Sequence, residues 1–438
     1  DAELLVGGKN YNTALISRVE GVRIPQFRAI SSVAFHIVLD ECKVCAALIR
    51  SMVDEAYNRI DWASPEVTKD HEFLPKFVRS VAAEIRKASE ADPELQYSDY
   101  YIWSDSKDSL PTKKFVRSDA ARDGNYMKNF FDIQPALNYG YLHPDPAQPW
   151  QQGYDDPGPT AVRNELKNII SFWMDKGVDG FRCDMAMLVP VEFWNEAARR
   201  LRKVNPGLFL LAEAEEPYLF EAGAFDACYA WEMHHLMNDV AQQKVRVTAL
   251  RDYIYADRNR YPQSAMRLVF TSNHDENSWN GSEFTRMGGA REIMAAFTFV
   301  VPRGLPLVYT GQEIGYDHSF AFFDRDPIPS YAANSFTDFY RRLAGLRHAN
   351  PALAAGEAGG EMVEIRNNAE DCLMTFVREV KGNRVVAVMN LSPYAIHADY
   401  YTGIYAGMYT DAMTGVACEL RGHVEEDMAP WSYRILTR

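Results

Sequence analysis

The chain has 438 residues, of which 47% are hydrophobic and 24% charged, as expected for a globular protein with a large core. Its net charge of −14 argues against a nucleic-acid partner, because binding to phosphates needs a basic surface, whereas a neutral ligand would not be repelled. No apolar run reaches the ~18 residues of a membrane helix, and no targeting segment opens the chain, so a cytoplasmic location and a secreted or periplasmic one after processing both stay open.

Cysteine and histidine spacing does not indicate a metal site. The six cysteines are dispersed, and the single Cys-x-x-Cys pair, Cys42 and Cys45, has no second pair beside it. The adjacent His234 and His235 also lack partner ligands at metal-binding spacing. We therefore predict neither a bound metal nor a disulfide scaffold.

Regular secondary structure is predicted mainly after residue 158. Residues 1–60 show no clear order of elements, and residues 63–158 form a loop-rich excursion with one helix expected near 74–88. From Pro159 onward, helical and strand patterns alternate. Helices are expected near 159–176, 191–203, 235–243 and 290–300. Strands are expected at 178–182, 208–212, 225–229, 268–270 and 305–309.

The predicted strands are short and apolar on both faces, which indicates a parallel sheet covered by helices. This repetition suits either a closed barrel or a doubly wound sheet. No G-x-G-x-x-G sequence follows any of the strands, so a dinucleotide-binding fold is disfavoured.

An antiparallel β domain is expected at the end of the chain. Residues 372–380 and 384–391 flank the turn Lys381-Gly382-Asn383, which predicts a hairpin, and further strands are expected at 408–411 and 431–436. The sequence therefore predicts two domains, 1–350 and 351–438.

Three acidic residues, Asp184, Glu213 and Asp275, each lie just past the end of a predicted strand. Active sites of α/β barrels gather at this carboxyl-end face. A single acid at such a position more often caps the following helix. Three together meet the needs of glycosidic-bond cleavage, which uses two carboxyl groups across the bond and favours a further anion near the positively charged ring.

The residues around these acids resemble three signature motifs of the α-amylase family of glycoside hydrolases, in the family's order and with comparable spacing. The motifs are Asp179–Ala186, Leu211–Glu213 and Phe270–Asp275. Two further stretches, Gln134–Tyr139 and Val308–Glu313, are similar to other motifs of the family, and the resemblance covers about residues 90–438.

The resemblance implies a (β/α)8 TIM barrel with a long excursion after an early strand, followed by a C-terminal antiparallel β-sandwich. It implies a retaining hydrolase of α-glucosidic bonds in α-1,4-glucans, maltooligosaccharides or cyclodextrins, which works through a covalent glycosyl-enzyme. Asp184 would be the nucleophile, Glu213 the general acid/base and Asp275 the third essential carboxylate.

Three further residues, Arg182, Asn273 and His274, are expected to contact the substrate. Arg182 should lie on the same side of its strand as Asp184, two residues later, and keep that carboxylate ionised. Glu215 and Glu216 do not follow the strand directly, and we expect them to be solvated or to lie at the rim of the site.

The chain departs from the family pattern in several places. In Asp61–Glu66, the best match to an early motif, Pro65 and Glu66 replace the family's asparagine and histidine. In relatives, that asparagine often ligates a structural calcium. Because Pro65 stands in its place here, a structural calcium is possible but doubtful, and no cofactor is expected to be required. Residues Met187 and Leu188 replace a Lys-His pair of many amylases, and Ala136 replaces an aspartate. About 60 residues precede Asp61, fewer than the resemblance implies, so this region is either truncated or divergent.

Two other functions remain open at this point. The same site could perform transglycosylation or isomerisation of α-glucosides, because exclusion of water decides between transfer and hydrolysis. A non-catalytic carbohydrate-binding relative is the third alternative, and it would not need all three acids at strand ends. The sequence leaves chain-length preference, linkage preference and oligomeric state open.

Overall fold

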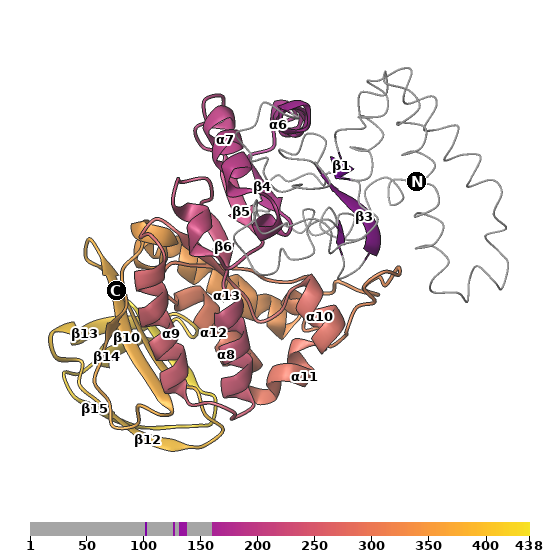
Figure 1. Cartoon of the computed structure of the whole chain (residues 1–438). Coiled ribbons are helices and arrows are strands. Elements are labelled where there is room, and N and C mark those ends of the chain that lie inside the picture. Colours follow the sequence, from indigo (N-terminus) through magenta and orange to yellow (C-terminus); the bar gives the residue numbers. More distant parts are fainter. Residues whose placement is uncertain (1–100, 103–125, 128–130, 138–159) are drawn as a thin grey trace, which may run out of the picture. The chain divides into compact units, whose positions relative to one another are not determined.

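The computed structural model describes residues 101–102, 126–127, 131–137 and 160–438 (Figure 1). The described residues form two compact units. The first includes the described residues up to Leu210 together with Glu221–Ala224, and the second consists of Leu211–Phe220 and Phe225–Arg438. The helix expected near 74–88, Cys42 and Cys45, and the motif Asp61–Glu66 lie outside the described residues.

The first unit contains a small antiparallel sheet in the excursion that we expected to be loop-rich. It consists of β1 (Tyr101–Ile102), β2 (Tyr126–Met127) and β3 (Phe131–Leu137), with β3 in the middle. Pro135 lies within β3, opposite Tyr126. A proline inside a strand and two-residue neighbours give little alternating pattern, which explains why the sequence analysis missed this sheet.

The alternating elements of the first unit follow the prediction. They are α6 (Thr160–Asp175), β4 (Gly180–Cys183), the short 3-10 helix η4 (Ala186–Leu188) and α7 (Val191–Leu201). Gly177 ends α6 with a φ of 85°, a conformation that costs glycine little. Gly180 has no room for a side chain, since a Cβ there would lie 2.4 Å from the carbonyl oxygen of Phe209. This close approach explains the glycine in the Asp179–Ala186 motif.

Parallel strands form the centre of the second unit. The chain enters it within β5 (Phe209–Ala212), and β5 is followed in hydrogen-bonded order by β6 (Ala227–Tyr229), β7 (Met266–Val269) and β8 (Gly304–Pro306). All three pairings are parallel. The intervening helices are α8 (Trp231–Ala241), α9 (Val247–Arg260), α10 (His274–Asn280), α11 (Glu283–Met287), α12 (Arg291–Val300) and α13 (Ser335–Ala349). The predicted parallel α/β arrangement is therefore confirmed, while α9, α10, α11 and α13 were not predicted.

The C-terminal strands form two antiparallel sheets. The larger has the order β14-β13-β16-β11-β10-β9, and the smaller pairs β12 with β15. Their bounds are β9 Val363–Glu364, β10 Leu373–Val380, β11 Asn383–Asn390, β12 Ile396–Tyr400, β13 Gly407–Asp411, β14 Ala417–Leu420, β15 Val424–Met428 and β16 Tyr433–Thr437. The predicted hairpin joins β10 to β11 through Lys381 and Gly382, whose φ angles are 49° and 85°. Positive φ at both central positions is typical of tight hairpin turns.

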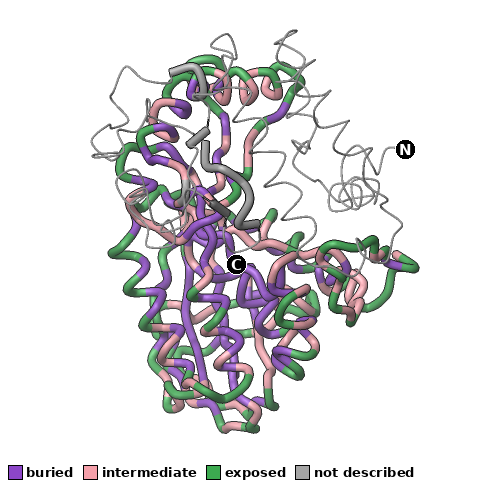
Figure 2. The backbone as a smooth tube through the Cα atoms, turned by 45° about the vertical axis from the view of Figure 1, so that its right-hand side comes forward, coloured by how far each residue is buried: buried purple, intermediate pink, exposed green. Residues whose placement is uncertain are grey.

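The central strands of the larger sheet are buried on both faces. Along β11, Val385, Ala387 and Met389 pack in one core with residues of α8, α9, α12 and α13, whereas Val386 and Val388 pack in a second core with residues of β12 and β15. Successive side chains of a strand point to opposite faces, so one apolar run serves both cores. The second core lies between two sheets, as predicted for a β-sandwich, and buried segments run through the interior of this unit in Figure 2.

Arg378 of β10 connects the C-terminal sheet to the end of α12. It is 1% exposed, and its guanidinium donates hydrogen bonds to the carbonyls of Val300, Val301, Ala354 and Gly360. A cation near helix-terminal carbonyls is stabilising.

We predict that Arg378→Met destabilises the protein by about 3 kcal/mol or more, because it leaves buried carbonyls without donors. The thermal unfolding midpoint, compared with that of Arg421→Met, checks this. Arg421 has a side chain that is 78% exposed and should be neutral to substitution. Equal midpoints for the two variants would contradict the assigned role of Arg378.

Candidate active site

Asp184 directly follows β4, as the sequence predicted. Arg182 donates a hydrogen bond to the Asp184 carboxylate, which gives the expected ion pair on one side of the strand. Cys183 lies between them and is buried, and burial raises the pKa of its thiol to about 12. Such a thiol is disfavoured as a nucleophile, because the thiolate is the reactive form. After Asp184, the chain turns at Met185, which has a φ of 45°.

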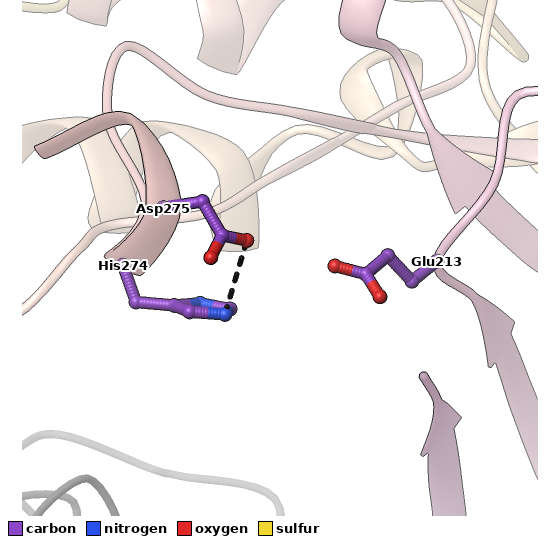
Figure 3. A group of neighbouring side chains, drawn as sticks. All are labelled: Glu213, His274 and Asp275. Carbon is purple, nitrogen blue, oxygen red and sulfur yellow. Dashed lines mark ion pairs between the residues drawn. The ribbon is translucent and has the colours of Figure 1, made fainter. Parts of the chain in front are cut away.

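Glu213 directly follows β5 in the second unit and is 8% exposed. Its carboxylate points towards Asp275 and His274, which lie in the first turn of α10 (Figure 3). One carboxylate oxygen of each acid and a ring nitrogen of His274 all lie within 4.8 Å of one another. The His274 Nε2 atom is 3.2 Å from Asp275 Oδ2. The structure therefore brings these three predicted site residues together.

Asp275 reaches this position from a helix rather than from the end of a strand, which corrects our expectation. β7 ends at Val269, and Asn273 is the N-cap of α10. The Asn273 Oδ1 atom accepts hydrogen bonds from the backbone N–H groups of Asp275 (3.0 Å) and Glu276 (2.8 Å). Asn273, and not Asp275, therefore caps α10. The Asp275 side chain faces Glu213 instead (Figure 3).

Asn273 itself is 1% exposed, and its observed role is to hold the first turn of α10. Its predicted contact with substrate stays a prediction. The same applies to the substrate contacts expected of Arg182 and His274.

Arg286 anchors the connection between β7 and α10. It is 8% exposed and donates hydrogen bonds to the carbonyl of Thr271 (2.8 Å), the hydroxyl of Ser272 (3.1 Å) and the side chain of Asn238 (2.8 Å). Its Nε–H also donates to the carbonyl of Gly281, just after α10. One guanidinium therefore fixes both ends of the segment that carries Asp275.

A buried contact between a glutamate and a histidine holds the next residue of α10. Glu276 lies 3.1 Å from His234 Nε2, and His234 Nδ1 donates to the carbonyl of Phe270. Burial opposes ionisation of Glu276, but hydrogen bonds from His234 and Asn280 and the charge of Arg286 lower its pKa to about 2. Burial lowers the pKa of His234, against its hydrogen bonds to Glu276 and Phe270. This contact of His234 was not predicted, because the spacing of His234 and His235 argued only against metal binding.

Glu215 is not solvated, contrary to our expectation. Its carboxylate pairs with Arg267, accepts a hydrogen bond from the Tyr253 hydroxyl (3.0 Å) and caps the backbone N–H of Glu232 (2.8 Å). Burial raises the pKa of Glu215, and the charge of Arg267 opposes this. Arg267 also lies 3.1 Å from Asp257. This network fixes the chain two residues after Glu213.

Two groups among the described residues place donor atoms close enough to hold a cation. One is Glu213, His274 and Asp275, and the other is Asp399, His423 and Glu425 in the C-terminal β domain. Calcium takes six to eight oxygen ligands. A histidine and two carboxylates fit this requirement poorly in both groups, so the structure gives no support to calcium there.

Family models match most of the chain. The α-amylase catalytic-domain model matches residues 78–343, and the model of the α-amylase C-terminal all-β domain matches residues 365–433. The chain belongs to the α-amylase family. Family membership confirms the predicted fold, a (β/α)8 barrel with a C-terminal β domain, while the exact boundary near residue 350 stays a prediction.

Individual relatives agree with this assignment. The α-amylase MalA of Haloarcula japonica is 30% identical over 340 residues, covering 75% of this chain and 43% of that protein. The trehalose synthase/amylase TreS of Mycobacterium tuberculosis is 25% identical over 451 residues, covering 77% of this chain and 68% of that protein. The crystal structure of a maltogenic α-amylase from Thermotoga neapolitana matches with a TM-score of 0.60 at 18% identity, covering 84% of this chain and 80% of that one.

The family assignment leaves part of the relatives' length unmatched. The chain spans about half the length of several curated relatives that it matches.

Among the residues that the structure describes, no helix is long and apolar enough to cross a membrane.

We predict that Glu276→Gln lowers stability most above about pH 4.5, the ordinary pKa of a glutamate. The lowered pKa of Glu276 means that its ionised form stabilises the folded state above that pH, and that this stabilisation is lost as the pH falls towards 2. Thermal unfolding midpoints of the unmodified chain and the variant should therefore converge in acid. A difference that stays constant from pH 7 down to the acid limit of folding would contradict the assignment.

Proposed function

We propose that the chain is a retaining glycoside hydrolase that cleaves α-glucosidic bonds of α-1,4-glucans, maltooligosaccharides or cyclodextrins. The observation that carries the proposal is the convergence of Glu213, His274 and Asp275 within 4.8 Å beyond the ends of parallel strands, in a chain of the α-amylase family. An α-linked oligo- or polysaccharide is then the substrate, and no cofactor takes part in the reaction.

Glu213 is suited to the role of general acid. It is nearly buried, and its carboxylate lies close to that of Asp275. Two carboxylates at this distance repel each other when both are ionised, so a state with one proton is favoured. The imidazole of His274 lies 3.2 Å from Asp275. When this imidazole is protonated, its positive charge favours Asp275 as the ionised carboxylate of the two. The proposed role of Glu213 as general acid requires the shared proton to reside on Glu213.

The reaction proceeds in two displacements. Glu213 gives its proton to the glycosidic oxygen while the Asp184 carboxylate attacks the anomeric carbon, so the bond to the leaving sugar breaks and an ester to Asp184 forms. Arg182 stabilises the Asp184 anion before attack. A water molecule then gives a proton to Glu213 and its oxygen to the anomeric carbon, which releases Asp184. Asp275 binds sugar hydroxyls and stabilises the positively charged ring.

Transglycosylation or isomerisation of α-glucosides is the second candidate. The observation in its favour is the similarity to a protein named trehalose synthase/amylase over 77% of this chain. In that case a sugar hydroxyl would replace water in the second displacement. A non-catalytic carbohydrate-binding relative is disfavoured because a pure binding site does not require a buried acid facing a second carboxylate.

The proposal is tested by product analysis with a panel of maltooligosaccharides, cyclodextrin, starch, isomaltose, sucrose and trehalose. We predict products with the unmodified chain and a loss of at least ~10³-fold in kcat for Asp184→Asn, because the ester cannot form. Product lengths separate hydrolysis from transfer. Substantial turnover by folded Asp184→Asn would exclude Asp184 as the nucleophile, and no turnover of any of these sugars by the unmodified chain would refute the proposed function.

We predict that Glu213→Gln reduces the first displacement of maltooligosaccharides by ~10²–10⁴-fold, because their leaving hydroxyl needs a proton. A 4-nitrophenyl α-maltoside, whose leaving group needs little protonation, should lose far less in the pre-steady-state burst. Glu357→Gln, which changes an exposed acid, serves as the control and should match the unmodified chain. Equal losses on both substrates would exclude Glu213 as the proton donor.

A further inference from the structure

Three aromatic side chains cluster at the surface of the second unit. Trp279, Phe322 and Phe323 have ring centroids 4.8–6.3 Å apart, and Trp279 and Phe323 are 54% and 67% exposed. We name these three residues the aromatic platform. Grouped, exposed apolar side chains are uncommon on protein surfaces and mark binding sites more often than single ones do.

The aromatic platform adjoins the proposed active site. Trp279 and Asp275 both lie on α10 and are separated by four positions, that is, one turn along the same face of the helix. Side chains with this spacing have Cβ atoms ~5–6 Å apart. When one sugar ring contacts Asp275, the next sugar of the same chain is therefore close enough to reach the Trp279 ring.

Polar contacts beneath the platform fix its shape. The Asn277 side chain, on the buried side of α10, donates to the carbonyl of His318 (2.9 Å) and accepts from the backbone N–H of Phe320 (2.7 Å). Further along the loop, Asp326 accepts a hydrogen bond from the backbone N–H of Ala321 (2.9 Å) and pairs with His318 (2.7 Å). The segment that carries Phe322 and Phe323 is thus tied down at both ends, which lowers the entropic cost of binding a ligand.

We propose that the aromatic platform is a subsite that stacks on a glucose unit of an α-linked glucan chain, next to the unit held at Asp275. This inference rests on the proposed function. The apolar face of a pyranose ring is flat and uncharged, so it fits an aromatic face and is not repelled by a chain of net charge −14. Continuity with the acid cluster favours the glucan over a protein partner, whose contact would need a larger apolar area.

The subsite makes affinity depend on the length of the glucan. A maltose molecule at the acid cluster gains little from Trp279, whereas a longer chain extends over the platform. We expect the platform to improve the Kd of maltoheptaose about tenfold, a factor that corresponds to ~1.4 kcal/mol.

The test uses calorimetric titration of the full chain carrying Glu213→Gln, which strongly slows turnover. Trp279→Ala and Phe323→Ala are each added to this background, and maltose and maltoheptaose are the ligands. Both variants should weaken maltoheptaose binding about tenfold and leave maltose binding unchanged. Tyr401→Ala is the control, because Tyr401 is also 54% exposed but lies in the C-terminal domain, and it should change neither Kd.

The outcomes separate this proposal from the function on which it rests. If the Glu213→Gln chain binds maltoheptaose and neither platform variant weakens that binding, the platform is not a subsite, although the proposed function stands. If that chain binds no maltooligosaccharide at all, the proposed function and the subsite both fail. Sedimentation showing a dimer that Trp279→Ala dissociates, with sugar binding unchanged, would make the platform a subunit interface instead.

Discussion

Arg286 lies buried beneath the turn that joins β7 to α10, and the acceptors around it determine how this turn is built. Burial of a guanidinium is costly unless its donors are paired. Burial lowers the pKa of Arg286, and the charges of Glu276 and Glu283 oppose this shift. The acceptors are the Thr271 carbonyl, the Ser272 hydroxyl, the Asn238 amide and the Gly281 carbonyl. A turn that satisfies this cation has little freedom to move, and it carries His274 and Asp275.

Each of the two acids that face each other has a neighbouring glutamate that is held by a buried partner. On the side of Asp275, the pair between Glu276 and His234 adds to the Asn273 cap. On the side of Glu213, the pair between Glu215 and Arg267 holds the next turn of the chain. Glu276 directly follows Asp275, and Glu215 comes two residues after Glu213. Buried partners thus hold the carboxylates of Glu213 and Asp275 near each other. Close carboxylates repel when both are ionised, so this arrangement favours a state with one proton.

Candidate site residues could be placed from the sequence where they directly follow a predicted strand. Asp184 and Glu213 come immediately after strands, so their placement at strand ends was predictable. The motif grouped Asp275 with Glu213, which lies near it in the structure. The position of Asp275 in a helix depends on the Asn273 cap, and the run Asn273-His274-Asp275 does not reveal that cap. The pairing of Glu215 with Arg267 joins residues 52 positions apart and requires the fold. The aromatic platform escaped the sequence analysis for the same reason, because Phe322 and Phe323 meet Trp279 only through the folded loop.

The central claim is that Glu213 and Asp184 carry out two successive displacements at one anomeric carbon. The most direct measurement is ¹H NMR of the anomeric protons during the first minutes of maltoheptaose cleavage, before the released sugars mutarotate. Two displacements retain configuration, so the α-anomer of the newly formed reducing end should be the first product, with the β-anomer rising only at the rate of mutarotation. If the β-anomer formed first, a single displacement by water would have occurred, and the assignment of Asp184 as a nucleophile would be wrong.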